Sequence, residues 1–133
     1  MSVRQVLFED VYDGSANFAP AAVIGLPLHD VVSRWRFQVS EGDDGLDKFT
    51  AVLLVLELRD GRTAKFALWH HHGNPEGTFA IHLALPQVGE PGLVSLILDD
   101  LGIPEQAVSW RSPERRDALS LKPRAKALQG QAP

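Results

Sequence analysis

Alternating apolar and polar positions predict an antiparallel sheet in the middle of the chain. Residues 50–58 and 63–72 are both rich in β-branched, aliphatic and aromatic side chains, and Asp60-Gly61 lies between them. An Asp-Gly pair between two such runs is typical of a two-residue hairpin loop, because both loop positions favour a positive φ. A turn over 73–77 then leads to a further strand over 78–85.

The segment before this hairpin has two interpretations. Residues 33–39 alternate polar and apolar side chains as a half-buried strand does, and the acidic segment 41–47 predicts a loop after it. A helical stripe competes with that strand, on these side chains: Leu28, Val31, Val32 and Trp35.

One helix is predicted after the sheet. Leu93, Leu96, Ile97 and Leu101 recur at helical spacing, and Gly102 is a natural C-terminal stop. The predicted fold class is therefore α+β. It combines an antiparallel β-meander sheet of four or more strands with one main C-terminal helix packed on one face.

The two turns predict which side chains share a face of the sheet. A two-residue loop at Asp60-Gly61 pairs Val55 with Phe66, and a four-residue second loop pairs Trp69 with His82. The predicted core face holds Leu53, Val55, Phe66, Leu68, His70, His72, Phe79, Ile81, Leu83 and Leu85. The predicted second face holds Val52, Leu54, Leu56, Leu58, Lys65, Ala67, Trp69, His71, Ala80, His82 and Ala84.

The second face carries the leading functional hypothesis. Four aliphatic side chains in a row on a face without a predicted cover indicate a contact surface, unless the N-terminal thirty residues cover it. We therefore expect a small non-catalytic binding or regulatory module, of the adaptor or inhibitor type, with a protein partner or a second copy as in a homodimer. The predicted contact residues are Leu54, Leu56, Leu58, Trp69 and Arg36.

A small enzyme or ligand-binding domain is the alternative. It would use Trp69, His71, His82 and Arg36 on that same face. No nucleophile elbow, phosphate loop or paired catalytic carboxylates accompany these residues, so we favour a non-catalytic role without a cofactor and assign no catalytic residue.

Four histidines raise the question of a metal site. Side chains alternate along a strand, so His70 and His72 share one face, whereas His71 and His82 share the other. A transition metal needs imidazoles that converge on one ion. The sequence therefore predicts no metal ligands among them.

The composition of the chain predicts a basic C-terminal tail and bears on the cellular compartment. Residues 111–133 hold six basic and two acidic side chains, whereas residues 1–110 hold seven basic and fifteen acidic ones. We predict one α+β domain over 1–110 and a largely flexible tail over 111–133. The acidic domain argues against nucleic-acid binding. Because the start lacks a signal-peptide pattern and no membrane span is present, we expect a soluble, cytoplasmic protein.

Overall fold

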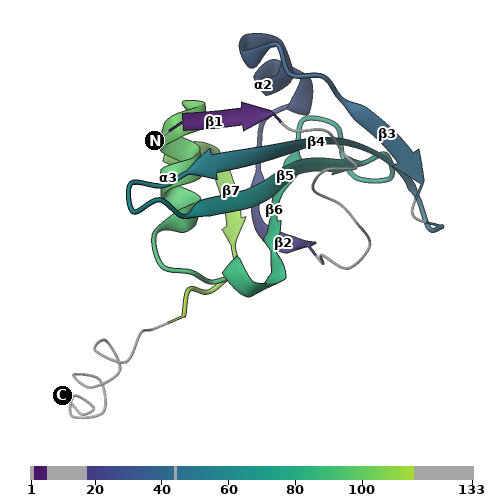
Figure 1. Cartoon of the computed structure of the whole chain (residues 1–133). Coiled ribbons are helices and arrows are strands. Elements are labelled where there is room, and N and C mark those ends of the chain that lie inside the picture. The colour runs from purple at the N-terminus through teal and green to yellow at the C-terminus, as the bar shows by residue number, and fades with distance from the viewer. Residues whose placement is uncertain (1, 6–17, 44, 116–133) are drawn as a thin grey trace, which may run out of the picture.

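The chain folds into a sheet that packs against two helices (Figure 1). The computed structural model describes residues 2–5, 18–43 and 45–115. The strands are β1 (Ser2–Gln5), β2 (Phe18–Ile24), β3 (Ser40–Asp43), β4 (Lys48–Glu57), β5 (Thr63–His71), β6 (Phe79–Ala84) and β7 (Val108–Arg111). The helices are α2 (Leu28–Trp35) and α3 (Leu93–Leu101), with 3₁₀ turns η1 (Leu85–Gln87) and η2 (Glu105–Ala107).

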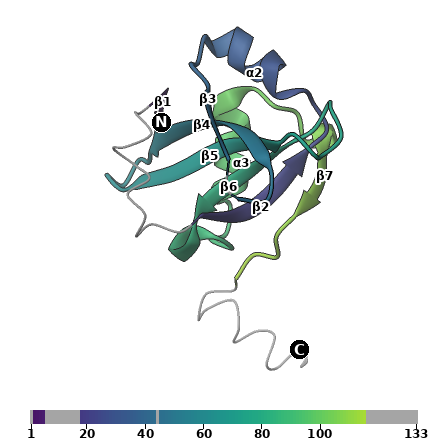
Figure 2. The ribbon, with the colours of Figure 1, turned by 90° about the vertical axis from the view of Figure 1, so that its right-hand side faces the viewer.

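Seven strands within the described residues form one antiparallel sheet in the order β1-β4-β5-β6-β2-β7. β3 and β1 pair with the first and second halves of the same edge of β4. Figure 2 shows β7 outermost, beside β2. The predicted α+β class and antiparallel sheet are confirmed.

α3 is the predicted C-terminal helix, and it closes the core on one side of the sheet. Its buried side chains are Leu93, Val94, Ile97, Leu98 and Leu101. Gly102 ends the helix, as predicted, at a φ of 74° with its N–H bonded to the carbonyls of Leu98 and Asp99. The last carbonyls of α3 also accept hydrogen bonds from α2, because Arg34 reaches Leu101 and Gly102, and Trp35 Nε1 reaches Leu101 at 3.2 Å.

The strand predicted over 33–39 is wrong, because the competing helical stripe forms α2 instead. Leu28 and Val31 are buried in the core from this helix. Arg36 ends it in the left-handed region at a φ of 60°, with its N–H bonded to the Val32 carbonyl. Helical spacing prevails because it places a continuous apolar stripe against the sheet, which a strand over 33–39 would split between two faces.

The loop predicted over 41–47 is also partly wrong, because Ser40–Asp43 forms β3. This short strand pairs Gly42 with Phe49 of β4. A Cβ atom placed on Gly42 would lie 2.6 Å from Phe49 Cζ. The absence of a side chain at Gly42 therefore leaves room for the tip of the Phe49 ring beside β3.

Gly42→Ala is expected to destabilise the fold by about 1–3 kcal/mol, since the Phe49 ring must move away from the new methyl group. Chemical denaturation measures this change. Ser40→Ala, on the same face of the same strand, is the matched control and should stay close to the wild-type value. Equal stability of both variants would contradict the close packing of Gly42 on Phe49.

The predicted register of the first hairpin is wrong by one residue. Leu54 pairs with Phe66, and Leu58 closes the loop by hydrogen bonding to Arg62, with an N–O distance of 2.8 Å. The loop therefore has three residues, and Gly61 occupies the left-handed position at a φ of 88°. A type I turn followed by a left-handed glycine is the common three-residue hairpin loop.

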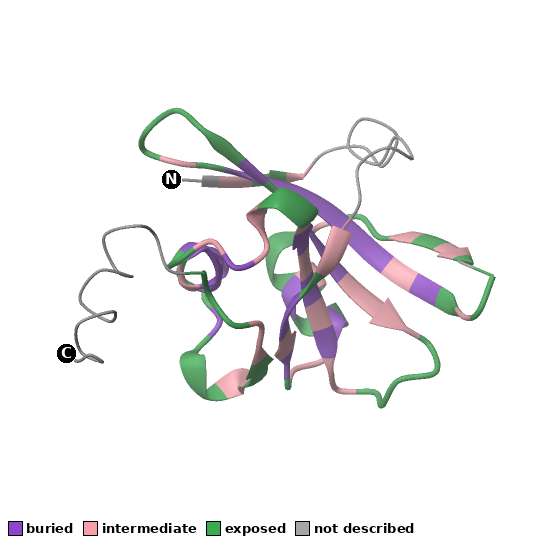
Figure 3. Cartoon of the chain, turned by 90° about the horizontal axis from the view of Figure 1, so that it is seen from below, coloured by how far each residue is buried: buried purple, intermediate pink, exposed green. Residues whose placement is uncertain are grey.

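A shift of one residue moves every side chain of β4 to the opposite face. The core cluster consequently contains Val52, Leu54 and Leu56, whereas Leu53 belongs to a smaller cluster with Ala67 on the other face. The second hairpin differs from its predicted register by two residues, since Leu68 pairs with Ile81. That even shift leaves the faces of β5 and β6 as predicted, except that Leu85, predicted in the core, lies in η1 and is 51% exposed. Figure 3 shows the buried residues running along the central strands.

The ends of the chain are described in part. Arg111 ends β7, and Arg115 donates its backbone N–H to the Gly89 carbonyl. The rest of the predicted tail, 116–133, and residues 6–17 of the N-terminal thirty lie outside the described residues. Among the helices that the structure describes, none is long and apolar enough to cross a membrane.

Candidate functional site

The histidines of β5 and β6 fall into two groups on opposite sides of the sheet, as the alternation predicts. His71 and His82 lie near Trp69 on the second face. His70 and His72 lie on the side of α2, with their ring centroids 6.2 Å apart. The chain therefore has two separate sites to consider.

The second-face group is an aromatic stack. The Trp69 ring lies between Phe49, at a centroid distance of 4.2 Å, and His82, at 5.2 Å and nearly parallel. Trp69 Nε1 donates to His71 Nε2 at 3.4 Å. Both rings stack on the indole, and the indole N–H is hydrogen-bonded to His71. These contacts favour a structural role for the stack.

Burial of His82 has an electrostatic consequence. Loss of solvent, and to a smaller extent the neighbouring His71, lowers the pKa of His82 from 6.5 to about 4. Arg36, the fourth residue of the predicted ligand site, is not part of this group. It caps α2, which packs on the opposite side of the sheet.

The predicted partner-binding residues are also separated. Leu54 and Leu56 are fully buried in the core under α3, and Leu58 packs against the same cluster. Trp69 belongs to the second-face stack, on the other side of the sheet. Leu54 and Leu56 are therefore inaccessible to a partner in the folded chain.

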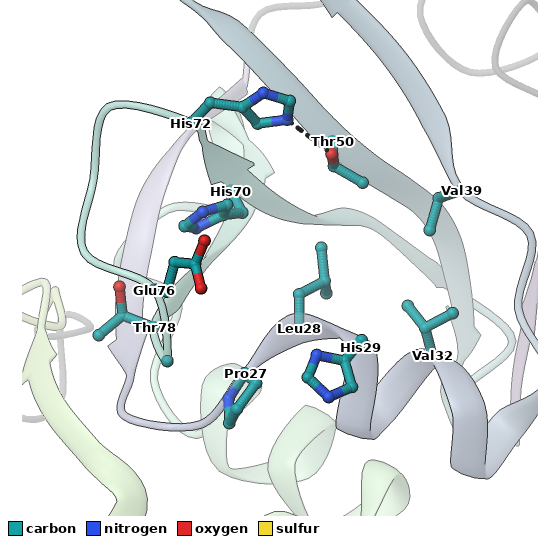
Figure 4. A pocket seen from close by; sticks show the side chains of 11 residues that line it. Pro27, Leu28, His29, Val32, Val39, Thr50, His70, His72, Glu76 and Thr78 are labelled. Atoms are coloured by element: carbon teal, nitrogen blue, oxygen red, sulfur yellow. Dashed lines mark hydrogen bonds between the residues drawn. The ribbon is translucent and has the colours of Figure 1, made fainter.

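A pocket of about 670 Å³ lies between α2 and the ends of β4 and β5 (Figure 4). Clefts of a few hundred to about 1,000 Å³ are typical of small-ligand sites. Its walls come from α2, the segment after it, β4, β5 and the β5–β6 connection. The lining residues are Pro27, Leu28, His29, Val32, Val39, Thr50, His70, His72, Glu76, Gly77 and Thr78.

The sheet side of the pocket presents two imidazoles. Thr50 lies opposite His70 in the β4–β5 ladder, and its hydroxyl hydrogen-bonds to His72 Nε2 at 3.0 Å. His70 differs, because its Nδ1 is buried and has no hydrogen-bond partner among the described residues. A tautomer with the hydrogen on Nε2 avoids a buried N–H without an acceptor. We therefore assign the hydrogen of the neutral His70 ring to Nε2, which makes Nε2–H the donor of this side chain.

The opposite side of the pocket is apolar, and its rim is polar. Pro27, Leu28 and Val32 of α2, together with Val39, provide the aliphatic surface. His29, at the rim, is held by Asp30 at 3.2 Å. The pocket thus combines an apolar wall with hydrogen-bonding groups, as ligand sites commonly do.

No set of three histidine, aspartate or glutamate side chains gathers closely enough to hold a metal ion within the described part of the chain. Of the two pocket histidines, His72 is hydrogen-bonded to the Thr50 hydroxyl, and both line the pocket together with the apolar wall.

Sequence reasoning missed this pocket because its residues come from five separate parts of the chain. The alternation correctly placed His70 and His72 on one face. The available signal was the pair of histidines at the open end of a strand, on the face that otherwise carries core side chains.

Comparison with known proteins finds no family model, no curated protein and no solved structure that matches the chain.

Proposed function

We propose that the protein is a small-ligand-binding domain, and that its ligand occupies the pocket between α2 and the ends of β4 and β5. The observation that carries the proposal is that His70 lines this pocket while its Nδ1 is buried without a hydrogen-bond partner among the described residues. An unpaired buried polar atom lowers stability, so its presence at a concave site indicates a use beyond folding.

Protein binding, the leading hypothesis from the sequence, stays a prediction. Its basis on Leu54 and Leu56 is removed, since both side chains lie in the core. The pocket supports the ligand-binding alternative better, although with His70 and His72 in place of His71 and His82.

The proposal predicts opposite effects for the same substitution at two adjacent histidines. His70→Phe keeps a ring and removes the unpaired nitrogen, so the free energy of unfolding should rise by about 1 kcal/mol. His71→Phe deprives the Trp69 N–H of its acceptor, so the free energy of unfolding should fall by a similar amount, about 1 kcal/mol. Urea denaturation measures both. A clear loss of stability in His70→Phe would show that this histidine serves the fold.

Ligand binding itself is tested by a fragment screen with NMR detection. Fragments that bind should shift the resonances of His70, His72 and Val32 in the wild-type protein. The same fragments should bind more weakly to His70→Phe and with unchanged affinity to His71→Phe. A screen without any fragment at these residues would refute the proposed function.

A further inference from the structure

The polar groups of the pocket differ in what they offer a ligand. His70 offers a donor to the pocket, because the hydrogen of its ring is assigned to Nε2 and not to the buried Nδ1. This donor calls for an acceptor on the ligand, such as a carbonyl oxygen.

The β5–β6 connection offers acceptors. The Thr78 hydroxyl donates its hydrogen to the Pro75 carbonyl at 2.8 Å, so only lone pairs remain on its oxygen. The Glu76 carboxylate also offers acceptor oxygens, and Glu76 lines the same pocket. Figure 4 shows Glu76, Thr78 and His70 on the side of the pocket that faces away from Val32 and Val39. This side therefore combines one donor with two acceptors.

The charge and the apolar surface of the pocket restrict the class of ligand further. Glu76 is the acidic residue among the pocket-lining side chains, and it disfavours a carboxylate or phosphate head group beside it. An ammonium group would suit Glu76, but it would leave the His70 N–H facing a donor. The apolar wall of Leu28, Val32 and Val39 suits an aliphatic body.

Building on the proposed function, we propose that the pocket takes an uncharged ligand with an amide-type head group on an aliphatic body. The ligand carbonyl would accept from His70 Nε2–H, and the adjacent N–H would donate to Glu76. An amide places an acceptor beside a donor, which is the arrangement that these residues complement.

A matched series of three compounds tests this head group. Cyclohexanecarboxamide, cyclohexanecarboxylate and cyclohexylmethylamine share one ring and differ in charge and hydrogen bonding. We expect the amide to bind the wild-type protein most tightly in NMR titrations. His70→Phe and Glu76→Ala should each weaken amide binding by roughly three- to tenfold, as expected for one lost hydrogen bond. His71→Phe, on the other face, should leave it unchanged.

Other outcomes overturn the inference in distinguishable ways. Tightest binding of the carboxylate, strengthened by Glu76→Ala, would show that the site prefers an anion. Tightest binding of the amine, lost in Glu76→Ala, would show a cation site. If none of the three binds but other fragments shift His70, the amide inference fails and the proposed function stands. If no fragment of any kind shifts His70, both fail.

Discussion

Replacing Leu54 with aspartate is expected to leave the chain unfolded. Leu54 is fully buried on the central strand pair, opposite Phe66 and within the cluster that α3 covers. Truncating a buried leucine costs about 3–5 kcal/mol. A buried carboxylate without a partner adds several kcal/mol more. Their combined cost approaches the whole stability of a typical domain, about 5–15 kcal/mol.

Leu46→Asp is the matched control, because Leu46 is 96% exposed. This variant should unfold within about 0.5 kcal/mol of the wild type. Circular dichroism and thermal unfolding of both variants measure the difference. A Leu54→Asp protein that stays folded and monomeric would contradict the buried position, and it would restore the partner-binding surface inferred from the sequence.

The partner-binding surface was inferred from the sequence because the first hairpin loop was predicted to be one residue shorter than it is. Asp60-Gly61 fits a two-residue loop, but the same glycine also fits the third position of the loop that begins at Arg59. Hydrophobic alternation cannot decide between them, because residues 52–56 are all apolar and all buried, on both faces of β4. The sequence therefore predicts the strands and their antiparallel pairing, but not the faces of β4.

Other strands kept their predicted faces because they alternate. In β5, exposed Lys65 stands beside buried Phe66, so the two faces can be told apart. The pocket was beyond prediction for another reason. It requires the position of α2 relative to His70, which depends on how the Leu28 and Val31 side chains pack in the core. Sequence periodicity identifies these side chains but does not determine where the helix lies on the sheet.

The second-face stack leads to a pH-dependent stability. His82 is half-buried and parallel to the Trp69 ring, at a centroid distance of 5.2 Å. His71, close to Trp69, also opposes protonation of His82, to a smaller extent than burial does. Burial and this neighbour together disfavour the imidazolium form in the folded state, which lowers the pKa of His82 to about 4.

The sign of the effect follows from proton binding. In the unfolded chain His82 binds a proton near its ordinary pKa of 6.5, whereas in the folded chain it does so only near pH 4. Between these values the unfolded state holds more protons, so the free energy of unfolding falls as the pH falls. The full contribution is about 3 kcal/mol, and it is complete below the folded pKa. Above the unfolded pKa His82 adds no pH dependence.

His82→Phe isolates this contribution, because phenylalanine keeps a ring against Trp69 and cannot titrate. Urea denaturation of wild type and variant at pH 7.0 and pH 4.0 should show a steeper loss of stability in the wild type, by about 3 kcal/mol. NMR titration of the His82 ring should give a midpoint near the folded pKa of about 4. Parallel profiles for wild type and His82→Phe would mean that the imidazolium form of His82 is accommodated in the stack.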